Sequence, residues 1–195
     1  MPSVSAMPAA NEHCDDPDAA LMLEAAGGSE QALRMLIEKW QTPLINFFYR
    51  SLGSAEQAED LTQLVFIRVY RAASTYEPRA KFSTYLFHIA RRLLINEYRR
   101  RSRKPLEAVD PADLEAETPG RDKLSLMEIE EAFEKALETL PENQRTAILL
   151  LKQQELSYEE IAAAMDATET AVKSWIHRAR QKLKTELKDF YRSAS

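Results

Sequence analysis

The chain has 195 residues, of which 45% are hydrophobic and 29% are charged, and a formal net charge of −5, which suits a globular protein of one large or two small domains. No stretch approaches the roughly eighteen uncharged apolar residues of a membrane-spanning helix, and the N-terminus lacks a secretory pattern, so we expect a cytoplasmic protein without membrane insertion. The single cysteine, Cys14, excludes an intrachain disulfide and gives with His13 at most half of a metal site, so we expect no metal and no cofactor.

The first third of the chain predicts helices. Only four glycines and few alternating Val, Ile and Thr runs argue against β-sheet, while apolar residues recur at helical spacing. We expect a disordered tail at residues 1–17. Ser29 then caps a helix that stops at Gly53, and Pro43 permits a kink or a restart within it.

The next two helices complete an N-terminal bundle. Ser54 and Gln57 form a capping-box pattern in which Ser54 caps and Gln57 reaches back, and this begins a helix to about residue 71. Residues 73–81 break the periodicity, and a further helix follows at about residues 83–101. The pattern predicts a first domain over residues 18–104.

A polar linker divides the chain. Residues 105–123 contain three prolines, a glycine and several carboxylates, and they lose helical periodicity. Helical spacing resumes at Leu124 and predicts a second domain over residues 124–195. The expected fold class is all-α, with an N-terminal helical bundle and a C-terminal helix-turn-helix joined by a flexible acidic linker.

The last two predicted helices have the spacing of a helix-turn-helix, whose second helix lies in the DNA major groove. Ser157 and Glu160 repeat the capping-box pattern ahead of a short helix, a tight break and a long helix. The long helix has an apolar stripe, made of Val172, Ile176, Ala179 and Leu183. The side chains left outside, which could meet bases or phosphates, are Thr170, Lys173, Ser174, His177, Arg178 and Gln181. An ordinary helical hairpin with a charged exterior would give the same pattern.

Charge is sorted along this layout. Residues 68–104 hold eleven basic and two acidic side chains, whereas residues 105–143 hold three basic and twelve acidic ones. The last helix, residues 170–195, is again basic, with seven cationic and two acidic side chains. Two cationic surfaces on two linked domains suggest one long polyanion that is contacted twice, although a single charge run is often only a solvated helix face.

Three segments carry a resemblance to a known family. They are AEDLTQLVFIRVYR, FSTYLFHIARRLLINEYRRR and LPENQRTAILLLKQQELSYEEIAAAMDATETAVKSWIHRARQKL. These segments are similar to the two domains of bacterial RNA polymerase sigma factors of the extracytoplasmic-function (ECF) group, in the family's order. The resemblance covers about residues 25–104 and 124–188, and it implies a factor that binds core polymerase, recognises the minus-thirty-five and minus-ten promoter elements, and promotes promoter melting and transcription initiation in a stress response.

The resemblance also implies roles for residues of the first domain. It implies that Asp60, Gln63 and Phe66 dock on the coiled coil of the polymerase β′ subunit, and the helical spacing agrees that Asp60 and Gln63 point outwards together. Residues 73–81 correspond to a loop that captures an unpaired minus-ten base, and residues 82–103 to the helix along that element. The minus-ten contacts so implied are Tyr76, Arg79, Lys81, Arg91, Arg92, Asn96, Arg99 and Arg100. Among the aromatic rings there, we expect Tyr76 to be exposed.

For the second domain, the resemblance assigns recognition of the minus-thirty-five element to residues 169–182, with the contacts Thr170, Lys173, Ser174, His177 and Arg178. Asp166 departs from the family, since the turn often has glycine there, and Arg92 and Trp175 replace other common residues. The implied partners are the β′ and β subunits of core polymerase, promoter DNA and an anti-sigma factor.

Two other functions remain compatible with the residues alone. A two-domain helix-turn-helix regulator could bind an operator as a dimer without being a polymerase subunit, but residues 91–104 would then have no role. An RNA-binding or interaction protein would use the basic helix alone. An enzyme is not supported, because the sequence lacks a glycine-rich phosphate loop, a nucleophile with a plausible base, and a histidine pair at metal spacing.

Overall fold

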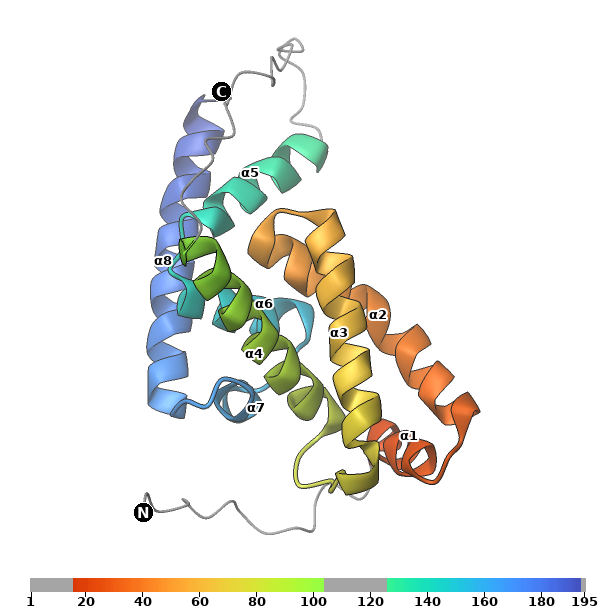
Figure 1. The fold of residues 1–195 in the computed structure, drawn as a ribbon. Helices are drawn as coiled ribbons and strands as arrows, with labels where there is room; N and C mark the ends of the chain where they lie inside the picture. Colours follow the sequence, from red (N-terminus) through yellow and green to blue (C-terminus); the bar gives the residue numbers. More distant parts are fainter. Residues whose placement is uncertain (1–15, 104–125, 194–195) are drawn as a thin grey trace.

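The computed structural model describes residues 16–103 and 126–193, which form eight α-helices and one 3₁₀ turn (Figure 1). These are α1 (Pro17–Ala26), α2 (Glu30–Leu52), α3 (Ala55–Ala72), η1 (Ala73–Thr75), α4 (Phe82–Arg103), α5 (Leu126–Glu138), α6 (Glu142–Gln153), α7 (Tyr158–Ala164) and α8 (Glu169–Ser193). The expected all-α fold is confirmed, whereas the expected linker lies outside the described residues. Within the described ranges, no helix combines the length and apolarity that a membrane crossing requires.

Side chains at the helix starts explain the boundaries of the first bundle. Ser29 and Ser54 accept hydrogen bonds from backbone N–H groups three residues on, at 3.2 and 3.4 Å, and so cap α2 and α3 as expected. The capping box expected at Ser54 is only half formed, because the Gln57 side chain accepts a hydrogen bond from Arg101 of α4 instead of reaching back. Pro43 lies inside a continuous α2, so the chain does not restart there.

Helix α1, which begins inside the range expected to be a tail, is held by two carboxylates. The Asp16 side chain accepts hydrogen bonds from the N–H groups of Asp18 at 3.0 Å and of Phe82 at 2.6 Å, which joins the starts of α1 and α4. The Asp18 side chain is buried and accepts from Lys39 Nζ at 2.6 Å and from Trp40 Nε1 at 3.1 Å. The rest of the expected tail, residues 1–15, lies outside the described residues.

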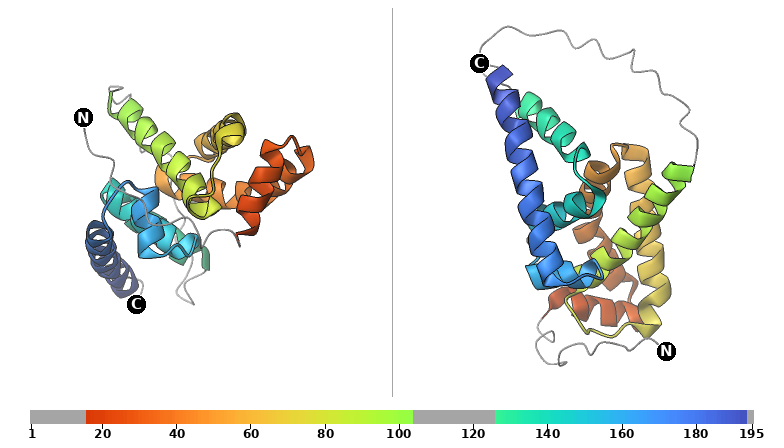
Figure 2. Two further views of the ribbon diagram at one scale, coloured as in Figure 1. Left: turned by 90° about the horizontal axis from the view of Figure 1, so that it is seen from below. Right: turned by 90° about the vertical axis from the view of Figure 1, so that its left-hand side faces the viewer.

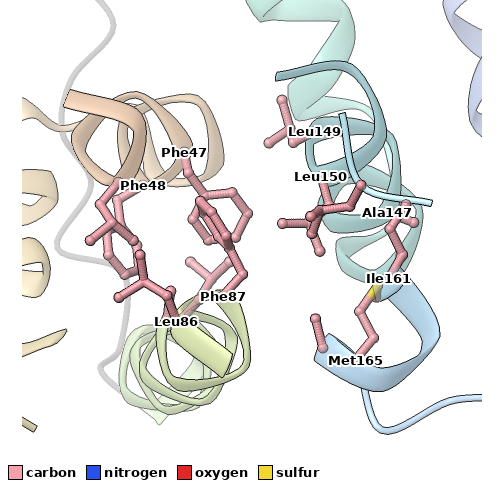
Figure 3. Close-up of a cluster of buried hydrophobic side chains, with 14 of the residues drawn as sticks. Phe47, Phe48, Leu86, Phe87, Ala147, Leu149, Leu150, Ile161 and Met165 are labelled. Atoms are coloured by element: carbon pink, nitrogen blue, oxygen red, sulfur yellow. The ribbon is translucent and has the colours of Figure 1, made fainter. Parts of the chain in front are cut away.

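The buried side chains of both halves of the chain form one continuous cluster. Figure 3 shows the side chains that α2 and α4 contribute, Phe47, Phe48, Leu86 and Phe87, and across from them those of α6 and α7, Ala147, Leu149, Leu150, Ile161 and the following Met165. The rings of Phe47 and Phe87 meet edge to face with centroids 5.4 Å apart, a favoured aromatic geometry. The two domains are therefore packed against each other in this structure.

Helix α4 lies between the two halves of the molecule. It packs on α3 in the first domain and on α7 in the second, whereas α8 packs on α5, α6 and α7. Figures 1 and 2 show α8 along one edge of the molecule, with α2 and α3 at the other. The two basic helices thus occupy different environments, one between the domains and one at the periphery.

Candidate nucleic-acid interface

The helix-turn-helix forms as the sequence predicted. The Ser157 side chain accepts from the Glu160 N–H at 3.2 Å, and the Glu160 carboxylate accepts from the Ser157 N–H at 2.7 Å, which completes the capping box of α7. Thr168 caps α8 by accepting from the N–H of Ala171 at 3.2 Å. Asp166, in the turn, has a φ of 48°, a left-handed conformation that glycine adopts with least strain. The turn therefore has an aspartate at a position where glycine would be less strained.

The face of α8 opposite its apolar stripe is open. The stripe itself is buried, as predicted: Val172, Ile176, Ala179 and Leu183. The predicted minus-thirty-five contacts are all exposed: Thr170, Lys173, Ser174, His177 and Arg178. Lys173 pairs with Glu169 one turn earlier at 2.9 Å, whereas Arg178 has no ion-pair partner among the described residues. This surface can present a cation and several hydrogen-bonding groups to a groove.

Helix α4, together with the residue just before it, carries a polar stripe along one side, which we call the α4 stripe: Lys81, His88, Arg92, Asn96, Arg99 and Arg103. The side chains of this stripe are exposed from Arg92 on. Within the described ranges no ion pair neutralises Arg92, Arg99 or Arg103. Asn96, Arg99, Arg100 and Arg103 line an open hollow of about 470 Å³. Unpaired guanidinium groups along one stripe suit a phosphate backbone.

Another two arginines of α4 are neutralised within their own helix. Arg100 donates to the Glu97 carboxylate at 2.7 and 2.8 Å, and Arg101 Nε lies 3.5 Å from the same carboxylate. Glu97 is buried, and the hydrogen bond from Arg100 holds the pKa of its carboxyl below the usual range. Arg100, expected to contact the minus-ten element, therefore already has a partner in the free chain.

The first half of the α4 stripe faces the second domain. Lys81 Nζ lies 2.8 Å from the Glu160 carboxylate, and His88 Nε2 lies 3.2 Å from the Asp166 carboxylate. Arg91, at the edge of the stripe, has only 14% of its side chain exposed and lies 3.9 Å from Asp166. Burial lowers the pKa of Arg91, and Asp166 partly offsets this. Arg91 is thus mostly covered and His88 is partly covered, whereas Lys81 is paired but keeps 56% of its side chain exposed.

The loop before α4 differs from the prediction at Tyr76. We expected an exposed ring, but Tyr76 is half-buried between Phe82 and Tyr85, with centroids 6.4 and 5.1 Å away. Its hydroxyl is buried without a hydrogen-bond partner in the described part of the chain, and burial raises its pKa to about 12. The prediction was wrong because the loop sequence alone does not show that Phe82 and Tyr85, at the start of α4, pack against this ring. Arg79 is exposed and donates to Glu77 at 2.7 Å.

The predicted docking face on α3 is exposed at Asp60 and Gln63, while Phe66 is partly buried and packs on the core. Sequence reasoning missed its apolar neighbours, since Leu64 and Ile67 are 43% and 44% exposed. The available signal was their position outside the inward stripe of α3, because apolar residues off that stripe must face solvent or a partner.

No group of three or more His, Cys, Asp or Glu side chains in the described residues could hold a metal ion. The arrangement that the chain does offer is a set of cationic and hydrogen-bonding side chains on two helices.

Two known families match the two halves of the chain. Residues 36–104 match the Sigma-70 region 2 family, and residues 130–183 match the Sigma-70, region 4 family. The RNA polymerase sigma-H factor of Pseudomonas aeruginosa is 30% identical over 92% of this chain and 98% of its own length. The ECF RNA polymerase sigma factor SigE of Mycolicibacterium smegmatis is 33% identical over 90% of this chain and 70% of its own length.

Solved structures are similar over most of the chain. CnrH in complex with the cytosolic domain of CnrY has a TM-score of 0.69 at 25% identity, with 89% of this chain and 99% of that chain covered. The sigma factor RpoE in complex with the anti-sigma factor NepR from Bartonella quintana has a TM-score of 0.64 at 27% identity, with 80% and 96% covered.

Proposed function

This chain belongs to the ECF group of RNA polymerase sigma factors, and from that premise we propose which of its surfaces perform each step of initiation. A sigma factor is the polymerase subunit that recognises promoter DNA, so the chain binds core polymerase and directs it to promoters. The single observation that carries the assignment of surfaces is the presence of exposed cationic side chains on two helices, one in each matched region.

Helix α8 recognises the minus-thirty-five element from the major groove. Its exposed start combines Thr170, Ser174 and Arg178 one turn apart, so that a hydroxyl and a guanidinium can reach neighbouring base edges while the buried stripe fixes the helix on α6 and α7. Lys173 and His177 flank these residues and are placed to contact bases or phosphates.

Helix α4 and the loop at residues 73–81 bind the minus-ten element as it melts. Arg92, Arg99 and Arg103 are exposed and unpaired among the described residues, which suits electrostatic contacts that are independent of base identity. The loop, which holds the exposed Arg79 and the half-buried Tyr76, selects the unpaired base, because a base outside the stack can pack on an aromatic surface.

The outer face of α3 docks on core polymerase. Asp60 and Gln63 supply polar contacts, and the exposed Leu64 and Ile67 supply apolar area that would be buried on binding. Asp60→Ala with Gln63→Ala should weaken binding to purified core polymerase and leave helicity unchanged, while Glu38→Ala, an exposed change on α2, should do neither. Wild-type affinity in the double variant would remove this assignment.

We further propose that the chain has no catalytic activity of its own and acts in the cytoplasm, where polymerase performs the chemistry. One similar solved structure is a sigma factor bound to the anti-sigma factor NepR, and another is CnrH bound to the cytosolic domain of CnrY. We therefore expect an anti-sigma factor to bind and inhibit the present chain until a stress signal releases it.

Promoter-dependent transcription with purified core polymerase tests the proposal. The chain plus core should produce run-off transcripts from a matching promoter, and core alone should not. A helix-turn-helix regulator that acts without being a polymerase subunit is disfavoured by the match to both sigma regions, and it would leave core polymerase inactive in this assay.

A further inference from the structure

Two carboxylates of the second domain contact the first half of the α4 stripe. They are Glu160 and Asp166, which we call the acidic pair. They reach α4 from different points, since Glu160 belongs to α7 and Asp166 to the turn after it. Lys81 lies 2.8 Å from the first, and His88 lies 3.2 Å from the second. The acidic pair therefore spans about two turns of the same stripe whose open half presents Arg92 and Arg99.

The contact also covers the loop that precedes α4. A hollow of about 280 Å³ lies between the two domains, with Tyr76 and Tyr85 on one side and Ala163 and Asp166 on the other. Thr84 also lines it, and its hydroxyl, like that of Tyr76, is buried without a hydrogen-bond partner in the described residues. The end of α7 and the turn after it thus form one wall of this hollow, opposite the loop that precedes α4.

Asp166 makes this contact from a left-handed backbone conformation. Its φ of 48° favours glycine, yet the side chain that makes the position unfavourable is the one that faces His88 and Arg91. Aspartate and asparagine tolerate this conformation better than most residues. A glycine there would relax the turn but would leave His88 and Arg91 of α4 without this carboxylate partner.

We propose that the acidic pair is an internal substitute for DNA phosphates, so that the free chain keeps the first half of its minus-ten surface occupied by its own second domain. This rests on the proposed function, because α4 must be the minus-ten helix for the substitution to matter. Binding of minus-ten DNA then requires the pair to separate from α4, and the equilibrium between closed and open chains sets the apparent affinity for DNA. Apolar contacts between the domains also favour the closed chain, so removal of the charges shifts this equilibrium without abolishing closure.

The first test measures domain separation without DNA or polymerase. Spin labels at residues 59 and 181, exposed positions of α3 and α8, are placed as cysteines in a Cys14→Ser background. Glu160→Gln with Asp166→Asn removes both charges, while glutamine still supports the capping box and asparagine still tolerates the turn. In this double variant, the distribution of distances between the two spin labels should broaden to longer values. Glu159→Gln, which removes an exposed charge from the same helix, should match the wild type.

The second test measures binding of a fluorescent single-stranded minus-ten oligonucleotide to the same full-length variants. The double variant should bind about two- to tenfold more tightly than the wild type, as expected for the loss of two partly exposed ion pairs that compete with DNA. An unchanged distance distribution would overturn the proposal, and so would a longer distance with unchanged DNA affinity. Failure of the opened variant to support transcription with core polymerase, despite tighter DNA binding, would count against the proposed function instead.

Discussion

The helices α4 and α8 are both long, amphipathic and basic, yet they present their charges differently. Helix α8 lies at the edge of the molecule, and its predicted DNA contacts are all exposed. Helix α4 lies between the domains, where Arg100 and Arg101 face Glu97 and Arg91 faces Asp166. The number of cations in a segment therefore does not give the number that a ligand can reach, because carboxylates of the same helix and of the second domain neutralise some of them.

The largest effect is expected at the open helix. Arg178→Ala should weaken binding of the holoenzyme to its upstream promoter element by about 1 to 3 kcal/mol if the guanidinium contacts a base pair. Lys184→Ala, an exposed change further along α8, is the control and should cost far less. Equal losses on every upstream sequence would show that Arg178 contacts only phosphate.

A smaller effect is expected for the buried carboxylate that neutralises α4. Glu97→Gln should lower the free energy of unfolding by about 1 kcal/mol, because a partly buried charge-assisted hydrogen bond to Arg100 is lost. The pKa of Glu97 is lowered in the folded chain, so its stabilisation is present above the ordinary carboxyl pKa and is lost as pH falls through the folded value.

Urea denaturation of the wild type and of Glu97→Gln at several pH values checks this pH dependence. The difference in stability between wild type and Glu97→Gln should be full near neutral pH and should shrink below about pH 4. A difference that grew on acidification would contradict the ion-pair account of α4.

Within α4, unpaired and paired arginines should differ. If Arg92 contacts a phosphate, Arg92→Ala should reduce the slope of log affinity against log salt for single-stranded minus-ten DNA by about 0.7. Arg100→Ala should reduce it less, because Arg100 is already bound to Glu97 in the free chain. Equal changes would mean that DNA binding releases Arg100 from its partner, and the distinction between the two arginines would fail.

The smallest effect is expected beside α4, at Tyr76. Because its hydroxyl is buried and unpartnered within the described residues, Tyr76→Phe should leave the melting temperature unchanged or raise it slightly. Tyr76→Ala is the informative comparison, since it also removes the contacts with Phe82 and Tyr85. A marked loss of stability in Tyr76→Phe would reveal a hydrogen bond to the hydroxyl.

Local signals predicted the fold well. Ser29, Ser54 and Ser157 cap helices because capping depends on residues within one turn, and the buried stripe of α8 follows from its spacing. The sequence did not predict what depends on remote partners. Gln57 bonds to α4, Asp16 links two helix starts, and the first half of the α4 stripe faces the second domain. The roles assigned to individual DNA contacts remain proposals.

The most direct test of the central claim, that two helices of one chain contact two parts of one promoter, is a combined footprint of the holoenzyme. DNase protection reports the upstream contact, and permanganate reactivity of thymines reports melting near the minus-ten element. Arg178→Ala should lose upstream protection while melting persists at high enzyme concentration, and Arg92→Ala with Arg99→Ala should keep upstream protection and lose melting. If both variants lost both signals together, the division between α8 and α4 would be contradicted.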